Sequence, residues 1–173
     1  LYEFSDVILE LDKSLGPFKS VITHSFGGPC LAFAMKNGLQ TSRVVNISPP
    51  SSTSGLVKKF THALNIPKKA ENALFRKIEK KFGSDVWQKT SMENNVRNLD
   101  LPAMVIHDTD DIDVPLSEGE SVANAWKNAS FIKTRNLGHR RILRDPETIN
   151  KAVEFIKASS YKTNSYNKTL MPC

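Results

Sequence analysis

Three side chains that could carry out nucleophilic catalysis occur in the order Ser25, Asp111 and His139 in this chain of 173 residues. A serine hydroxyl is a weak nucleophile at neutral pH, and an imidazole within reach can take its proton during attack and later return it to the leaving group. A carboxylate on the far ring nitrogen fixes the tautomer of the imidazole and stabilises the imidazolium ion. These residue types therefore suit acyl transfer through a covalent serine intermediate, provided that the fold brings them together.

Each candidate lies just after an apolar run that is typical of a buried parallel strand. The three runs are residues 18–23, 102–106 and 129–134. The carboxyl ends of parallel strands form one edge of a sheet, and open α/β sheets place their sites at that edge. We therefore expect the serine, the aspartate and the histidine to lie close together.

The turn Thr23-His24-Ser25-Phe26-Gly27-Gly28 joins a predicted strand to a helix-like run at residues 30–35. It resembles the nucleophile elbow of the α/β-hydrolase family, G-x-S-x-G, with Thr23 in the place of the first glycine. Gly27 and Gly28 are expected to let the helix start close behind the serine, because a Cβ would clash there. The alternative is a Ser-Gly-Gly turn that merely joins a strand to a helix.

Two later segments extend the resemblance. The segment from His107 to Pro115 is similar to the family's acid loop G-x-x-D-x-x-V-P, with Asp108 in the glycine position and Asp111 in the acid position. Gly138-His139 follows the last predicted strand, where the family keeps its catalytic histidine. The order of serine, acid and histidine is also that of the family.

The resemblance implies a role for each residue. Ser25 would be the nucleophile, His139 the general base and acid, and Asp111 the orienting acid. The backbone N–H of Phe26 would donate to the oxyanion. The second oxyanion donor of the family comes from a loop that precedes the nucleophile strand, and we do not find it in this sequence.

The acid loop contains four aspartates, at positions 108, 110, 111 and 113. Asp111 is favoured by its register with Val114-Pro115, and Asp108 and Asp113 remain the other candidates for the acid. A metal site is an alternative use of such a cluster. The EF-hand pattern needs a glycine at the sixth and a glutamate at the twelfth position, and this loop departs from it. We therefore expect no metal and no cofactor.

Three further histidines have simpler expected roles. His24 is expected to pack beside the nucleophile strand rather than react. His107 ends a strand and is expected to hydrogen-bond the acid loop. His62 lies in a basic helical stretch and is expected to face solvent.

Length and composition indicate one globular domain, with 39% hydrophobic and 24% charged residues. We find neither an apolar run of membrane-spanning length nor a secretory signal, and the two cysteines, Cys30 and Cys173, suggest no disulfide framework or zinc site. The expected location is the cytoplasm, without stable membrane insertion. We find no base-reading motif, so the expected partner is a small-molecule acyl substrate rather than a nucleic acid. The oligomeric state stays open.

The chain is expected to be the later part of a hydrolase domain. An amphipathic helix at residues 2–11 precedes the nucleophile strand, and four strands are predicted in all, the remaining one at residues 43–47. A sheet that begins at the nucleophile strand would expose the edge of that strand and an apolar face. We therefore expect a fragment that by itself is a poor catalyst.

Residues 48–99 form a long insertion between the second and third strands. Helical spacing predicts a helical cap over the active site, and it contains ten Lys and Arg against four Asp and Glu residues, a net charge of +6 that equals that of the whole chain. The outer face of the cap is either a solvated helix surface or a site for an anionic partner. The candidate pocket residues in the cap are Phe60, Leu64, Phe75, Ile78 and Trp87, for which packing within the cap is an equally good account.

Together these patterns predict an α/β fold: a three-layer parallel sheet of about four strands with flanking helices and a helical cap, a truncated α/β-hydrolase domain. Residues 1–159 would form this partial domain, and residues 160–173 a disordered tail. A serine at the elbow argues against the dehalogenase and epoxide-hydrolase branches of the family, which attack with a carboxylate. The expected function is hydrolysis of a carboxylic ester or related acyl compound through an acyl-enzyme. The alternative is a non-catalytic relative that binds an anionic partner through its basic cap.

Overall fold

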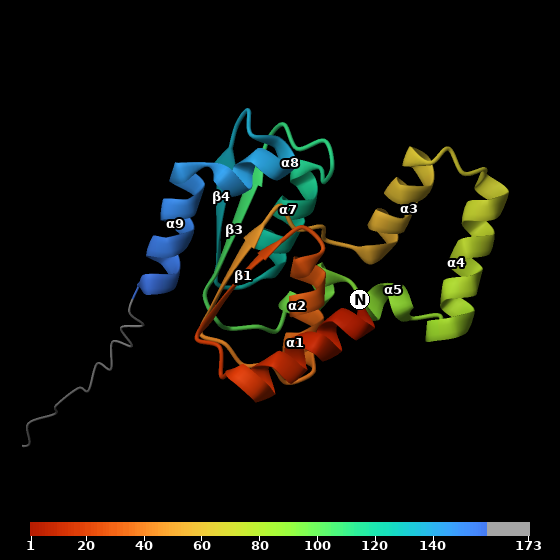
Figure 1. Cartoon of the computed structure of the whole chain (residues 1–173). Coiled ribbons are helices and arrows are strands. Elements are labelled where there is room, and N and C mark those ends of the chain that lie inside the picture. Colours follow the sequence, from red (N-terminus) through yellow and green to blue (C-terminus); the bar gives the residue numbers. More distant parts are fainter. Residues whose placement is uncertain (159–173) are drawn as a thin grey trace, which may run out of the picture.

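The core of the protein is a sheet of four parallel strands with helices on both faces, seen in a computed structural model that describes residues 1–158 (Figure 1). The strands are β1 (Ser20–His24), β2 (Arg43–Ile47), β3 (Ala103–Asp108) and β4 (Ala129–Thr134). They lie side by side in chain order, and every pair is parallel. The predicted parallel sheet is confirmed; the tail predicted at residues 160–173 lies outside the described residues.

The two central strands are apolar on both sides because both of their faces are covered. Val44 and Val105 point into a core formed with α2 (Gly27–Lys36), α6 (Met92–Val96) and α7 (Leu116–Ala125). Val45 and Ile106 point the other way, toward η1 (Ile142–Arg144) and α9 (Pro146–Lys157). Figure 1 shows α9 on one side of the sheet and α2 and α7 on the other. This arrangement fixes the strand ends from which the candidate residues project.

The β1 edge of the sheet carries an exposed apolar surface. Strand β1 pairs with β2 on one side, and Ile22 in its middle is 47% exposed. Beside it, α1 (Tyr2–Leu15) packs Ile8 and Leu9 against the core but leaves its other apolar side chains exposed. These exposed side chains are Phe4, Val7, Leu11 and Leu15. The predicted exposed strand edge is thus confirmed.

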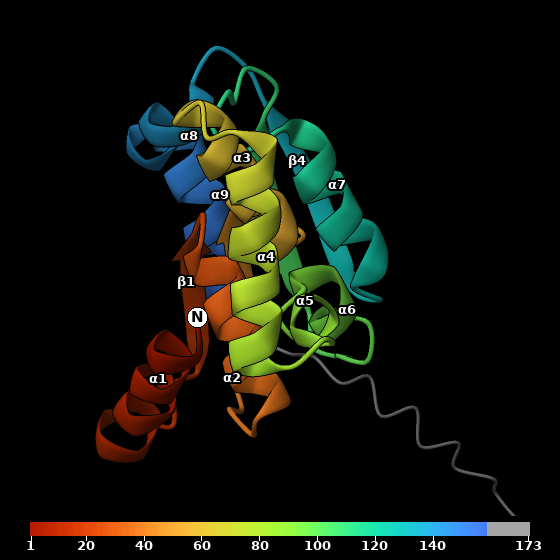
Figure 2. The same cartoon turned by 90° about the vertical axis from the view of Figure 1, so that its right-hand side faces the viewer.

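The segment between β2 and β3 is helical, as predicted, but its parts differ in where they pack. It contains α3 (Thr53–Ala63), α4 (Lys68–Phe82), α5 (Val86–Lys89) and α6. Figure 1 shows α3 and α4 as a pair that stands off the sheet, and Figure 2, turned by 90°, shows the same pair in front of it. Helix α6, in contrast, buries Met92 and Val96 in the core beside α2. The part that stands off the sheet is therefore shorter than the predicted insertion.

Candidate active site

Ser25 lies at the sharp turn between β1 and α2. Its φ of 51° is in the left-handed region, which a residue with a side chain adopts at a cost of about 1–3 kcal/mol. Two backbone bonds hold the turn: the Ser25 N–H donates to the carbonyl of Ile47 at 2.9 Å, and the Ser25 carbonyl accepts from the N–H of Gly28 at 3.0 Å. The side chain is partly exposed. This is the geometry that presents a nucleophile above the end of a strand.

The residues around the elbow explain two features of its sequence. Thr23 replaces the usual first glycine, and its hydroxyl donates to the buried side chain of Asn46 at 2.6 Å. A Cβ on Gly28 would lie 3.0 Å from the sulfur of Met92, so this position is tight. A Cβ on Gly27 would lie 3.5 Å from that of Thr23, which is ordinary contact. The expectation that both glycines are required by packing is therefore wrong for Gly27.

Asp111 is held by its own loop, which follows β3. One carboxylate oxygen, Oδ1, accepts the backbone N–H groups of Asp113 at 2.9 Å and Val114 at 2.8 Å. The other oxygen, Oδ2, lies 2.7 Å from Nδ1 of His139. Burial acts to raise the pKa of this carboxyl group, but the bonds from Val114 and His139 outweigh it and hold the pKa below its usual range. The carboxylate is therefore charged at neutral pH.

His139 lies in α8 (Gly138–Arg141), just beyond the end of β4. A carboxylate can only accept, so Nδ1 carries the proton that faces Asp111 and Nε2 keeps its lone pair. This is the tautomer that a general base requires. The loop that delivers the histidine uses left-handed backbone at Asn136, with φ 61°, and at Gly138, with φ 63°.

The other aspartates of the loop have different partners. The backbone N–H of Asp113 donates to Asp111, and its carbonyl accepts from the ammonium group of Lys59 on α3. The same ammonium group donates to the carbonyl of Ile112 at 2.6 Å, so α3 is tied to the acid loop. Within residues 1–158, no group of three or more potential ligands is arranged to hold a metal ion.

Asp108 joins the acid loop to the histidine loop, a role that the sequence pattern did not indicate. Its Oδ1 accepts the N–H groups of Asp110 at 3.0 Å and Gly138 at 2.9 Å, and its Oδ2 accepts the Leu137 N–H at 3.2 Å and the Thr134 hydroxyl at 2.7 Å. Burial acts to raise the pKa of this carboxyl group, but the four donors outweigh it and lower the pKa.

Replacing Asp108 with Asn should lower the free energy of unfolding at pH 7 by about 2–3 kcal/mol, because an amide nitrogen would face two of these donors. A lowered pKa stabilises the fold above the usual carboxyl pKa, and this stability is lost as the pH falls through the folded pKa. The difference between wild type and Asp108→Asn should therefore shrink in acid. Urea unfolding at several pH values measures it, with Asp113→Asn as the control; equal unfolding curves for Asp108→Asn and wild type at pH 7 would contradict this role.

His107 lies fully buried beneath the acid loop. Its Nε2 bonds the carbonyl of Val114 at 2.9 Å and lies 3.5 Å from Oδ2 of Asp111, which confirms the expected link to this loop. Burial lowers the pKa of its imidazole, although the bond to Val114 and the charge of Asp111 oppose this. A Cβ on Gly119 would lie 2.2 Å from Nδ1 of His107, so only glycine fits at this position of α7.

His24 contacts the histidine loop rather than merely packing beside the strand. Its Nε2 lies 2.9 Å from the backbone carbonyl of His139, and the centroids of the two rings are 4.6 Å apart. His24 directly precedes Ser25, so the elbow and the histidine loop are joined by this contact. His62 on α3 is exposed, as expected.

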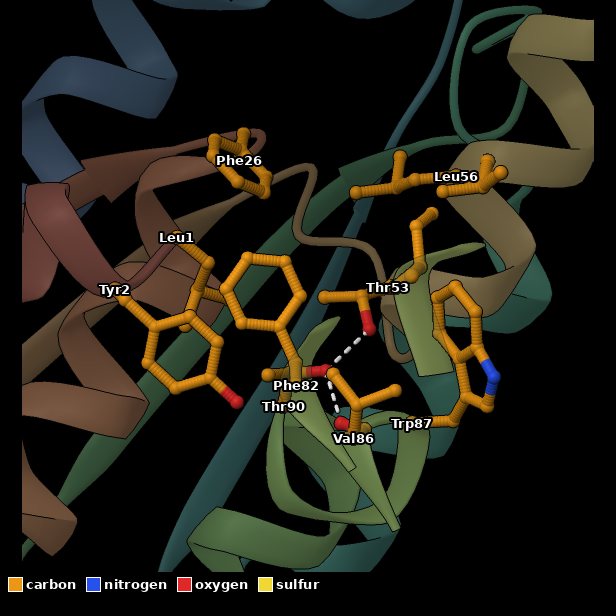
Figure 3. A pocket seen from close by; sticks show the side chains of 11 residues that line it. Leu1, Tyr2, Phe26, Thr53, Leu56, Phe82, Val86, Trp87 and Thr90 are labelled. Atoms are coloured by element: carbon orange, nitrogen blue, oxygen red, sulfur yellow. Dashed lines mark hydrogen bonds between the residues drawn. The ribbon is translucent and has the colours of Figure 1, made fainter. Parts of the chain in front are cut away.

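An apolar pocket of about 240 Å³ begins at Phe26, the residue that follows the candidate nucleophile (Figure 3). Its walls come from the start of α1 and from α3, α4 and α5. The lining residues are Leu1, Tyr2, Phe26, Thr53, Leu56, Val57, Ile78, Phe82, Val86, Trp87 and Thr90. The hydroxyls of Thr53 and Thr90 bond each other at 2.6 Å, and that of Thr90 donates to the Val86 carbonyl at 2.7 Å, so these polar groups are satisfied within the wall.

The predicted pocket residues are only partly correct. Ile78 and Trp87 line this pocket. Phe75 instead packs against Trp87, with ring centroids 4.7 Å apart and the rings tilted by 36°. Phe60 and Leu64 are 58% and 57% exposed. Within residues 1–158, no helix is both long enough and apolar enough to cross a bilayer.

Comparison of the sequence with protein-family models and with curated proteins finds no match. Comparison of the structure with solved structures does. The esterase RhEst1 from Rhodococcus sp. ECU1013 aligns with a TM-score of 0.64 and 16% identity, over 90% of this chain and 71% of that one. A Mycobacterium tuberculosis H37Rv protein described as the non-heme bromoperoxidase BpoC aligns with a TM-score of 0.57 and 15% identity, over 89% and 72%.

The meta-cleavage product hydrolase CumD from Pseudomonas fluorescens IP01 aligns with a TM-score of 0.57 and 14% identity, over 88% of this chain and 71% of that one. An α/β fold family hydrolase from Bacillus anthracis str. Sterne aligns with a TM-score of 0.59 and 12% identity, over 88% of this chain and 71% of that one. At these identities the likeness concerns the fold and not the substrate. The parallel sheet, its flanking helices and these neighbours agree: the chain has the α/β-hydrolase fold.

Proposed function

We propose that the protein is a serine hydrolase that cleaves a carboxylic ester or a related acyl compound through an acyl-enzyme. The observation that carries this proposal is the 2.7 Å bond between Asp111 and His139, formed at the sheet edge where Ser25 stands in a strained turn. Acyl transfer of this kind requires three groups: a charged carboxylate, an imidazole with its proton on the nitrogen that faces the carboxylate, and a serine hydroxyl presented by a sharp turn. The solved structures that share this fold include an esterase, a meta-cleavage product hydrolase and a protein described as a bromoperoxidase, and their fold agrees with the proposed enzyme class.

In the proposed reaction, Nε2 of His139 takes the proton of the Ser25 hydroxyl while Oγ attacks the acyl carbon. Asp111 stabilises the imidazolium ion that forms, and the N–H of Phe26 donates to the oxyanion. The tetrahedral intermediate collapses as the imidazolium ion protonates the leaving alcohol. Water then attacks the acyl-enzyme with the same histidine as base, which releases the acid and restores Ser25.

The pocket beside Phe26 supports an apolar group on the substrate. Its volume of about 240 Å³ lies just below the range of sites that take drug-sized ligands, so a small apolar group is expected there. Thioesterase, acyltransferase, C–C hydrolase and perhydrolase chemistry use the same three residues, and nothing in this geometry selects among them. Ester hydrolysis is the form in which we test the proposal.

The test is covalent labelling by a fluorophosphonate, which reacts with an activated serine and ignores an idle one. The wild-type chain should be labelled, and mass spectrometry should place the adduct on Ser25. Ser25→Ala should abolish labelling, whereas Ser42→Ala, at an exposed serine before β2, should leave it unchanged. An adduct on another serine, or equal labelling of wild type and Ser25→Ala, would show that Ser25 is not the nucleophile.

A second candidate function, binding of an anionic partner through the cap, is favoured by α4. This helix of 15 residues buries none of them, and its lysines and arginine supply most of the net positive charge of residues 48–99. If the wild-type chain ignores the fluorophosphonate but is retained on heparin in a salt-dependent manner, this second function would replace the first.

A further inference from the structure

His24 forms a direct contact between the nucleophile turn and the proposed general base. It is the last residue of β1, next to Ser25, and its Nε2 lies 2.9 Å from the carbonyl oxygen of His139. A carbonyl oxygen can only accept, so Nε2 of His24 carries the proton and donates it. The two imidazole rings lie 4.6 Å apart between centroids and are tilted by 43°.

The contact adds a second hold on the backbone around His139, beside the bonds that Asp108 accepts from Leu137 and Gly138. Helix α8 has only four residues, and it begins at Gly138, which like Asn136 before it has left-handed backbone. A helix this short has little ability to set its own orientation. Asp111 holds the side chain of His139 from the β3 side, and His24 holds its main chain from the β1 side.

We propose that His24 is a positioning residue that sets the distance between His139 and Ser25; this inference rests on the proposed function. Because His24 and Ser25 are consecutive, any shift of the histidine loop away from the elbow must break the bond to the His139 carbonyl. The bond therefore couples the position of the base to that of the nucleophile. It leaves Nε2 of His139, the atom that takes the serine proton, untouched.

The charge state of His24 agrees with this role. Burial lowers the pKa of its imidazole; the bond to the His139 carbonyl and the charge of Asp111 act to raise it, and the charge of His139 lowers it further. His139 and Asp111 are the titratable groups that act on His24. The net lowering keeps His24 neutral near pH 7, where it donates a hydrogen bond without placing a positive charge beside the imidazolium ion of the reaction.

The test compares His24→Leu, which cannot donate, with His24→Gln, whose amide nitrogen reaches about as far as Nε2. The rate of fluorophosphonate reaction at saturation should fall by about tenfold to a hundredfold in His24→Leu, the range expected for a misplaced catalytic group, while the half-saturating concentration stays unchanged. His24→Gln should recover most of this loss. His62→Leu, at the exposed histidine of α3, is the control and should react like wild type.

The outcomes separate the two proposals. If wild type is not labelled at Ser25, the proposed function fails and this inference fails with it. If wild type is labelled and His24→Leu reacts equally fast, or if Leu and Gln are equally slow, only the positioning role fails. A measurement on wild type tests the inference even if a variant does not fold. NMR of the ¹⁵N- and ¹³C-labelled protein should show His24 protonated at Nε2, with a coupling across the hydrogen bond to the His139 carbonyl. Observation of the Nδ1–H tautomer of His24 would overturn the inference.

Discussion

Replacing Asp111 with Asn should lower acyl-ester turnover by about three to four decades. The two backbone N–H groups of Asp113 and Val114 require a carbonyl oxygen at the Oδ1 position, so the new amide nitrogen must face His139. An amide N–H cannot accept the Nδ1 proton, and the histidine must therefore move its proton to Nε2. The atom that should take the serine proton is then already protonated.

The measurement compares turnover of a short-chain aryl ester, and the rate of fluorophosphonate reaction at Ser25, between wild type and Asp111→Asn. Asp113→Asn is a matched control, because this substitution changes the same loop. The bonds from Asp113 to Asp111 and Lys59 come from the main chain of Asp113, so they do not depend on its carboxylate. Folding of each variant is checked by urea unfolding. A greater loss of turnover in Asp113→Asn, or in a folded Asp108→Asn, would show that Asp111 is not the orienting acid.

Residues 1–173 by themselves are expected to turn over such an ester about two to three decades more slowly than an enzyme with two oxyanion donors. The reason is that one missing donor costs about 2.7–4 kcal/mol of transition-state stabilisation. The Phe26 N–H, at the start of α2, is the one donor that we propose. We propose further that a polypeptide covering the β1 edge supplies the second. Turnover should then rise to the full rate when such a polypeptide is bound, with Ser25→Ala as the inactive control in its presence and absence.

The exposed β1 edge and the apolar side chains of α1 should make residues 1–173 associate in solution. Among residues 1–158, β1 pairs with β2 alone, so its other side offers unpaired backbone groups. Phe4 and Leu15 of α1 add apolar surface, at 63% and 72% exposed. Sedimentation velocity should show association that decreases in a Phe4→Glu, Leu15→Glu variant, whereas Leu64→Glu, just after α3, should have no such effect. Rapid ester turnover by a monodisperse monomer would contradict both expectations and would mean that another N–H of this chain completes the hole.

The sequence alone was sufficient for the four strands, their parallel pairing and the sheet edge on which Ser25 and His139 lie. Those features follow from local patterns: apolar runs of strand length, a Ser-Gly-Gly turn and a Gly-His pair after the last strand. Helix α9 starts at Pro146 on an equally local signal, because the side chain of Asp145 before it accepts the Thr148 N–H at 2.7 Å. Such signals act within a few residues of the chain, so they survive without knowledge of tertiary contacts.

The sequence favoured Asp111 as the orienting acid but left Asp108 and Asp113 open, and the tertiary structure decided which groups meet across the sheet edge. The aspartates at 108, 111 and 113 have similar local sequence, and only packing of the β3 loop against the β4 loop directs Asp111 to His139 and Asp108 to the backbone of Leu137 and Gly138. The bond from His24 to the His139 carbonyl spans 115 positions in the sequence and has no local signature. Hydrogen bonds of this kind depend on the relative placement of whole strands, which is set by the summed packing of the core rather than by the residues that form the bonds.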